Sequence, residues 1–372
     1  MSGSGRDAGG PAAAVGRGGR GDALARRVRG VTEHLEVPFE IVGELLFKAQ
    51  YEEKIMDIGM TIPTRGPLAE PEVIVQLARR AEELGFAYLA VPDHIVVPRK
   101  IDSRYPYSAS GDFPGSDSGS CLDQFTVLTF LAAVTTTPRL VTSVTVIPHR
   151  GALESAKLVA SIDVLSQGRM TLGVGAGWMR EEFEALGAPS FDRRGQVTDE
   201  YLEAFKLLWT EDDPVFDGEF VRFRNISFLP KPVQKPHPPI WVGGESSPAL
   251  RRTARYGDTW YPIGNNPRFP LGSIERFKER VQRLGEIADE EDRDPASISL
   301  VYCALWFDEH KTLTLDDGSR HLLTGSVEQI AEDVAQLGEI GVQGLMLNFQ
   351  RDTLQQSLDS MQHFADVIRP AL

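Results

Sequence analysis

A histidine beside an aspartate is the first candidate for chemistry in this chain. Residues 91–94 read Val-Pro-Asp-His and close a short apolar run. An imidazole can act as a general acid or base near neutral pH, and a neighbouring carboxylate can orient it. We therefore interpret His94 as a candidate catalytic residue that Asp93 orients. A histidine that only caps a loop or packs in the core would give the same pattern.

Two glycine-rich turns are candidates for binding an anion, because glycine lets backbone N–H groups approach a ligand and a helix N-terminus favours phosphate. Each turn follows an apolar run and opens a helical stretch. They consist of Gly175, Ala176, Gly177 and Trp178, and of Gly243, Gly244, Glu245 and Ser246. Together they predict one phosphate site, whereas each alone also fits an ordinary strand–helix turn.

Other chemistries lack their signatures. The sequence contains no H-E-x-x-H, no G-x-x-x-x-G-K-[ST] and no G-x-S-x-G, so we expect no metal, no nucleoside triphosphate hydrolysis and no α/β-hydrolase triad. A formal net charge of −14 argues against nucleic-acid or anionic-membrane binding. The two cysteines give no disulfide framework, and no apolar run is long enough to span a bilayer. The start lacks the apolar stretch of a secretory signal, so we expect a cytoplasmic protein.

From Met56 onward, short β-rich runs alternate with amphipathic helical stretches. We expect strands at 56–62, 88–91, 140–147, 170–174, 240–242, 259–262, 298–307 and 344–348. We expect helices at 71–84, 123–136, 153–166, 180–186, 193–209, 249–256, 274–289, 327–337 and 353–368. A long loop covers 96–120, and an insertion at about 210–239 carries a hairpin. Eight strand–helix units predict an α/β fold of the (β/α)8 barrel type, with a doubly wound sheet as the alternative.

The segment before Met56 has a different composition. Residues 1–30 are rich in Gly, Ala and Arg, and such a segment cannot offset its ordering entropy. We expect a disordered or weakly ordered extension at 1–55, in which 31–55 could hold a short helix, and a barrel at 56–372. Met56 is a candidate natural start, the alternative being a genuine flexible tail. The intact mass of the protein from its native host would decide between them.

Several motifs, taken in order, resemble those of the bacterial luciferase-like superfamily of flavin- and deazaflavin-dependent oxidoreductases. They read VPDHIVVP, SRYPYS, TSVTVIPHR, LVASIDVLSQGRMTLGVGAGW, REEFEALG and PPIWVGGESSPALRRTARYGDTWYP. The resemblance covers nearly the whole chain after the N-terminal segment.

This resemblance implies a (β/α)8 barrel with insertion regions and a flavin-type ring at its C-terminal mouth. It places His94 beside the reactive ring, and it places a non-prolyl cis peptide between Ser143 and Val144, behind the ring. It also assigns the cofactor phosphate to 175–178 and 243–246.

The resemblance further implies an enzyme that uses coenzyme F420 or reduced FMN on a small organic substrate. Hydride transfer with F420 is favoured. The alternative is a monooxygenase that uses oxygen and reduced FMN, in which a separate reductase supplies the reduced FMN. Relatives are often homodimers, and we expect one here. A non-catalytic flavin-binding barrel and a cofactor-free isomerase or lyase acting on a phosphorylated substrate stay open.

Overall fold

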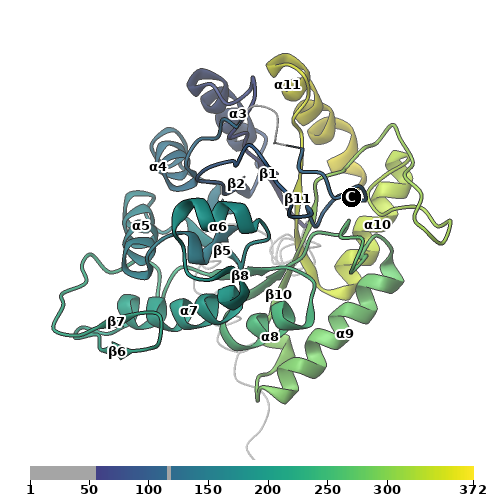
Figure 1. The fold of residues 1–372 in the computed structure, drawn as a ribbon. Coiled ribbons are helices and arrows are strands. Elements are labelled where there is room, and N and C mark those ends of the chain that lie inside the picture. Colours follow the sequence, from purple (N-terminus) through teal and green to yellow (C-terminus); the bar gives the residue numbers. More distant parts are fainter. Residues whose placement is uncertain (1–55, 115–118) are drawn as a thin grey trace, which may run out of the picture. The chain divides into compact units, whose positions relative to one another are not determined.

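Parallel strands close into a barrel in the computed structural model, which describes residues 56–114 and 119–372 (Figure 1). The strands are β1 (Asp57–Thr61), β2 (Tyr88–Val91), β3 (Arg139–Thr142) with its continuation β4 (Thr145–Val146), β5 (Met170–Gly175), β8 (Ile240–Gly243), β9 (Thr259–Tyr261), β10 (Ser299–Ala304) and β11 (Val342–Leu347). β1 pairs with both β2 and β11, and β3 pairs with β5, so the sheet has no open edge. The predicted (β/α)8 barrel is therefore confirmed, and the doubly wound sheet is not formed.

The expected strand 140–147 is split in two. β3 ends at Thr142, and β4 begins at Thr145. The peptide bond between Ser143 and Val144 is cis, as the resemblance implied. The Ser143 amide still donates to the Val91 carbonyl of β2, with a nitrogen–oxygen distance of 2.7 Å. Residues 143–144 therefore bulge at the mouth while the barrel wall stays closed.

Side chains fill the inside of the barrel, because alternate residues of each strand point inward. Trp241 lies between two tyrosines, with ring centroids 5.1 Å from Tyr88 and 5.3 Å from Tyr261. The inner cluster comprises Tyr88, Ala90, Val141, Trp241, Tyr261, Val301, Cys303 and Met346. The barrel is thus a packed core, and a ligand site must lie above it, at the mouth.

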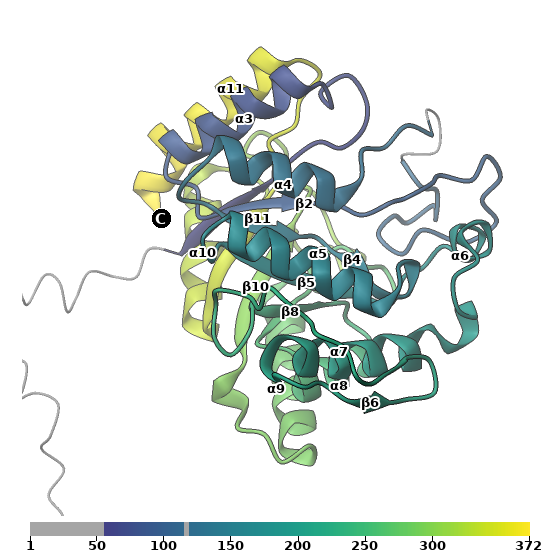
Figure 2. The same cartoon turned by 90° about the vertical axis from the view of Figure 1, so that its left-hand side faces the viewer.

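Helices surround the strands (Figure 2). They are α3 (Pro71–Glu83), α4 (Gln124–Val134), α5 (Ala152–Leu165), α6 (Arg180–Leu186), α7 (Arg194–Thr210), α8 (Ser247–Tyr256), α9 (Ile274–Glu290), α10 (Val327–Ile340) and α11 (Leu354–His363). Short 3-10 turns lie at Ile147–His149, Phe191–Arg193, Pro295–Ser297 and Arg369–Ala371, and a π-helical turn at Phe364–Ile368 follows α11. In α3 the apolar stripe of Ile74, Leu77, Ala78 and Ala81 is buried, as its spacing predicts.

The insertion carries the predicted hairpin, in which β6 (Phe216–Asp217) pairs antiparallel with β7 (Arg222–Phe223). The expected extension at 1–55 and the proposed start at Met56 concern residues outside the described part of the chain. Among the described residues, no helix is long and apolar enough to cross a membrane.

Candidate active site

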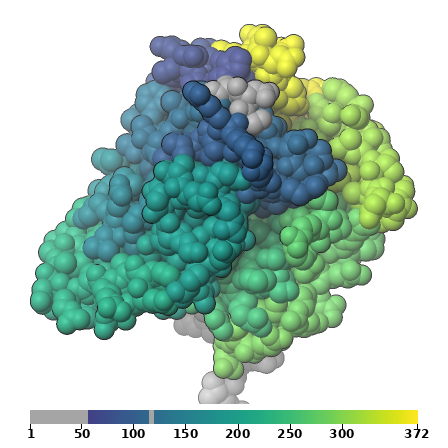
Figure 3. Space-filling view, in the orientation of Figure 1, coloured from purple at the N-terminus to yellow at the C-terminus, as the bar shows by residue number. Residues whose placement is uncertain are grey.

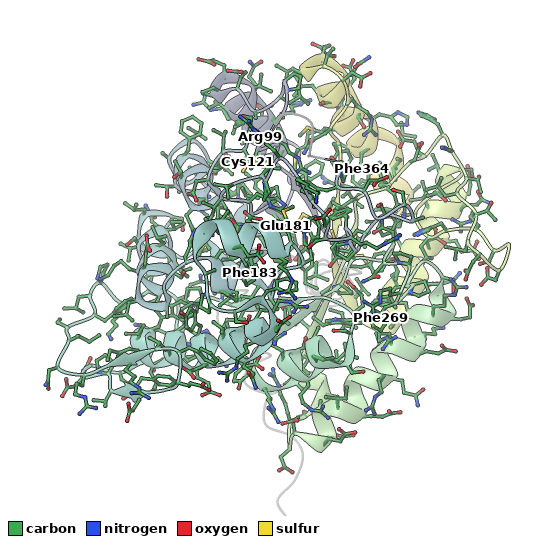
Figure 4. All side chains as sticks on the ribbon, viewed as in Figure 1. Arg99, Cys121, Glu181, Phe183, Phe269 and Phe364 are labelled. Carbon is green, nitrogen blue, oxygen red and sulfur yellow. The ribbon has the colours of Figure 1, made fainter. Side chains whose placement is uncertain are left out.

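His94 follows β2 at the mouth of the barrel and is held by a buried carboxylate. Its Nδ1 lies 2.8 Å from Oε2 of Glu182 in α6. The Glu182 side chain is fully buried, and its other oxygen accepts from the Ile95 amide at 2.8 Å and the Val96 amide at 3.3 Å. Figure 4 labels the residues on either side of it, Glu181 and Phe183. This contact fixes the imidazole and leaves Nε2 without a hydrogen-bond partner among the described residues.

The local electrostatics keep Glu182 ionised. Burial works to raise the pKa of this carboxyl, but the hydrogen bond from His94, the two nearby imidazoles and the Ile95 amide outweigh it, and the pKa lies below its usual value. A carboxylate on Nδ1 selects the imidazole tautomer and stabilises the protonated ring. The pair can therefore exchange a proton at Nε2.

Asp93 does not orient His94, contrary to the expectation from the sequence. Its carboxylate forms a two-pronged ion pair with Arg150, at 2.9 and 3.0 Å, and accepts from the Val146 amide at 3.0 Å. Arg150 also reaches Asp123 at 2.8 Å. These contacts join the ends of β2 and β4 to the start of α4, so Asp93 supports the site without touching the imidazole.

A second buried histidine lies on the other side of Glu182. His149 Nδ1 is 3.9 Å from Glu182 Oε1, and the ring packs edge-on against Phe183. Neither ring nitrogen has a hydrogen-bond partner among the described residues. Burial lowers the pKa of His149 against the opposing effect of Glu182. His149 is therefore a neutral neighbour of the pair.

Aromatic side chains enclose His94. Its ring centroid lies 4.9 Å from Phe113 and 6.4 Å from Trp178, and Tyr105 packs against both of these residues. The Arg65 guanidinium covers the outer side of Phe113 at 4.7 Å. These contacts shield His94 from solvent, which strengthens its electrostatic interactions.

Most of these aromatics come from the loop at 96–114, which crosses the mouth (Figure 3). On one side Glu181 of α6 accepts from the amides of Asp102 and Ser103, at 2.9 and 3.0 Å. On the other side Asn265, which follows β9, donates to the Tyr107 carbonyl at 3.0 Å. The loop therefore lies over the mouth as a cover, and α6 holds both this cover and His94.

Val144 forms a small apolar platform at the break between β3 and β4, because glycines let two backbones come close to it. A Cβ at Gly175 would lie 2.7 Å from Val144 Cγ2, and one at Gly243 would lie 3.2 Å from Cγ1. Ser143 Oγ lies 2.9 Å from the Tyr261 hydroxyl, which ties the bulge to the inner cluster.

The turn at 243–246 offers backbone donors. Gly244 has φ of 102°, a conformation that favours glycine, and Ser246 precedes α8 without a side-chain cap. The first N–H groups of a helix have no partner within it, so they can bind an anion. Glu245 points elsewhere, since its buried carboxylate accepts from the Ile263 amide and the Asn266 side chain at 2.9 and 2.7 Å. Burial raises the pKa of Glu245, the opposite of the change at Glu182.

The residues of the turn at 175–178 make other contacts within the protein. Gly177 has φ of 89°, and its carbonyl accepts from Arg194 Nε at 3.1 Å. Trp178 belongs to the aromatic cover, and Ala176 lies between these two residues.

Glu182 is the functional residue that sequence reasoning missed. It lies within the REEFEALG motif, next to the equally acidic Glu181, and nothing in the spacing says which of the two is buried. Among residues 56–114 and 119–372, no cluster of His, Cys, Asp and Glu side chains could hold a metal ion.

Comparison with known proteins shows which family this chain is similar to. The model of the luciferase-like monooxygenase family matches residues 56–305. An uncharacterized protein of Mycobacterium tuberculosis is 38% identical over 184 residues, which are 49% of this chain and 64% of that protein. An FMNH2-dependent dimethylsulfone monooxygenase of Pseudomonas putida is 35% identical over 211 residues, 56% of this chain and 51% of that protein. The chain thus spans less than two thirds of the length of these two relatives.

Solved structures share the fold. An F420-dependent secondary alcohol dehydrogenase in complex with an F420–acetone adduct superposes with a TM-score of 0.66 at 17% identity, covering 85% of this chain and 98% of that one. A monooxygenase from Streptomyces bottropensis gives 0.63 at 23% identity, covering 85% and 99%. Since the family model matches more than half of the chain, and the barrel and its mouth agree with it, the chain belongs to the luciferase-like monooxygenase family, whose members are flavin- or F420-dependent oxidoreductases.

Proposed function

We propose that this protein transfers a hydride between coenzyme F420 and a small organic substrate, with His94 as the acid–base residue. The observation that carries the proposal is the contact between His94 Nδ1 and the buried Glu182. Oxidation of an alcohol to a ketone releases one hydride and one proton, so the site needs a base near the reacting carbon. His94 Nε2 accepts that proton, and Glu182 stabilises the resulting imidazolium.

The residues at the mouth fit a ring cofactor with a phosphate. Val144 and its two flanking glycines would support the ring, and the turn at 243–246 would hold the phosphate. A bound deazaflavin or flavin supplies the hydride acceptor. The cover at 96–114 would exclude water from the pair of reactants, and the aromatic side chains around His94 would contact the apolar part of a small organic substrate.

A second candidate function is oxygenation of an organic substrate with reduced FMN from a separate flavin reductase. The similarity to the dimethylsulfone monooxygenase, 35% identity over 211 residues, favours it. In either case we propose that the protein works as a homodimer.

Titration with FMN and with coenzyme F420, each oxidised and reduced and followed by fluorescence, tests the two functions. We expect tight binding of F420 and weak binding of FMN. A preference for reduced FMN would replace the first proposal with the second. Binding of neither cofactor would overturn both and favour a cofactor-free barrel.

Replacing His94 tests its role. The H94A variant should lose about 100-fold or more in turnover while binding the cofactor nearly as well as the parent, because the imidazole acts on the proton. The matched control is H310A, since His310 is 79% exposed on a polar loop. Turnover of H94A equal to that of H310A would remove His94 from the mechanism.

A further inference from the structure

A groove of about 450 Å³ lies along the first half of α9, and none of the residues around His94 lines it. We call it the arginine groove. Its lining consists of Pro270, Leu271, Arg276, Glu279, Arg280 and Arg283. Three guanidinium groups thus face one carboxylate, although the whole chain is strongly acidic. Figure 4 labels Phe269, which precedes the lining residues.

No carboxylate within residues 56–114 and 119–372 forms an ion pair with Arg280. Its guanidinium instead stacks on the Phe269 ring, whose centroid lies 5.3 Å away. Stacking on an aromatic face leaves the N–H groups at the edge of the guanidinium free to donate. The side chain is half-buried, so the cation is held in place while its donors stay available.

Arg276 has an unused donor. Its Nη2 donates to Asp316 and Asp317, at 2.6 and 2.7 Å. Its Nη1 is buried and has no hydrogen-bond partner among the described residues. Arg276 lines the groove, and the two aspartates hold its guanidinium in place, so an anion in the groove would meet its positive charge.

The third arginine is paired only at the surface. Arg283 contacts Glu286 at 2.8 Å and Glu290 at 3.4 Å, and both carboxylates are about half exposed. Ion pairs of this kind contribute little, so a ligand can replace them at small cost.

The groove lies near the candidate phosphate turn. The Asn266 side chain donates to the Glu245 carboxylate at 2.7 Å. The Asn266 carbonyl accepts from the amide of Phe269 at 3.1 Å, and the ring of Phe269 stacks with Arg280. Glu245 belongs to the turn at 243–246, so one extended molecule can reach both places.

We propose that the arginine groove binds an anionic group, a carboxylate or a phosphate, on a molecule that also occupies the barrel mouth. Planar carboxylates and phosphates match the fork of a guanidinium. The group belongs either to a cofactor that carries carboxylates, as F420 does, or to an acidic substrate. Anion binding itself does not depend on the proposed function, whereas the choice between these two sources rests on it.

Calorimetric titration of the full chain with citrate tests the groove. We expect saturable binding and about a tenfold rise in Kd for R280Q, which loses one charged donor. The matched control is K278Q, because Lys278 is exposed on the same helix, does not line the groove and carries the same charge. Absence of citrate binding, or equal weakening in R280Q and K278Q, would overturn the proposal.

The source of the anion follows from the same variants. If R280Q weakens binding of coenzyme F420 but not of FMN, and citrate competes with F420 alone, the cofactor supplies the anion. If R280Q weakens citrate binding and changes neither cofactor affinity, the substrate supplies it. Failure of the proposed F420 function would leave the citrate result unaffected, so the two failures are distinguishable.

Discussion

The carboxylate of Glu182 organises the reactive end of the barrel. It receives a hydrogen bond from His94 and two backbone amides, and His149 lies on its far side. Removing a buried acceptor that serves several donors leaves each of them unsatisfied, and this costs more than the loss of a surface pair. Glu182 therefore supports the stability of the mouth and fixes the orientation of the His94 imidazole.

The lowered pKa of Glu182 sets how its contribution to the free energy of unfolding depends on pH. Because the folded-state pKa lies below the usual 4.5, the stabilisation is fully present above about pH 4.5 and is lost as the pH falls through the folded pKa. E182Q should lower the free energy of unfolding by about 2 kcal/mol at pH 7. The difference from the parent should shrink below pH 4.5.

Urea unfolding at pH 7, 5 and 4 measures this difference. E184Q is the control, because Glu184 is exposed on the same helix. A loss in E182Q that stays the same size at pH 4 would show that ionisation of Glu182 does not matter to stability.

The sequence revealed His94 but not its partner. A histidine after an apolar run is visible in the sequence, since strand ends in a barrel carry chemistry. The nearest acid in sequence, Asp93, was the natural candidate for orienting it, yet its carboxylate turns to Arg150. Glu182 is 88 residues away, and only the packing of α6 over the mouth brings it to His94. Local spacing carries no information about such a contact.

At the scale of elements, the break between β3 and β4 shapes the platform for the ring. Gly175 ends β5 beside this break, and any side chain there would meet Val144 at 2.7 Å. G175A should therefore destabilise the protein by about 1–3 kcal/mol and weaken cofactor binding. Thermal unfolding and the FMN and F420 titrations measure the two effects.

A second glycine gives the matched control. Gly285 lies within α9, where a new Cβ would meet only Pro295, at an ordinary 3.8 Å. G285A should raise stability by about 0.5–1 kcal/mol, because alanine favours a helix interior, and it should leave cofactor binding unchanged. If both alanine variants behave alike, close packing around Val144 is not what selects glycine at 175.

The cover at 96–114 depends on α6 in a way that proteolysis can measure. Glu181 accepts from two of its amides, and Arg180 N donates to the Ser103 hydroxyl. E181A should free the loop and speed tryptic cleavage after Arg99, Lys100 and Arg104, since local opening exposes the backbone to the protease. The control is E184A, on the same helix, and equal cleavage rates in the two variants would show that Glu181 does not hold the cover.

The elements themselves were largely readable from the sequence. β2 and α6 have the expected bounds, and most others differ by a residue or two at the ends, where helices fray. The interruption at 143–144 could not come from local pattern, because Leu140 to Ile147 reads as one continuous apolar strand. It was expected only through the family resemblance. The contacts that hold the cover to α6 and to Asn265 were out of reach, because loop side chains show no periodicity.

For the whole molecule, closure of the barrel follows from eight repeated units, and each unit buries its strand between neighbours.

The arginine groove was not predicted, although every one of its arginines is visible in the sequence. On a helix such as α9, arginines at this spacing ordinarily form a solvated face. Only the loop at Pro270 and Leu271, packed beside the helix, makes that face concave.

Assembly is the property that concerns the surface as a whole. α4 is apolar on nearly all sides, with the sequence Gln-Phe-Thr-Val-Leu-Thr-Phe-Leu-Ala-Ala-Val. On its outer face, the Phe130 side chain is 39% exposed. On the neighbouring α5, Leu165 is 63% exposed (Figure 2). A helix that is apolar all round is normally covered, and neighbouring exposed apolar side chains often mark an interface.

We therefore predict that a second copy covers α4 and α5. Light scattering after size-exclusion chromatography should give twice the chain mass of 41.0 kDa. The double variant F130E/L165E should shift toward the monomer, because each copy would bury two unpaired carboxylates in the dimer. V367E is the control, since Val367 is 44% exposed near the C-terminus, outside these two helices. A parent protein that runs as a monomer at micromolar concentration would contradict the predicted homodimer, and dissociation of V367E to the same extent would place the interface elsewhere.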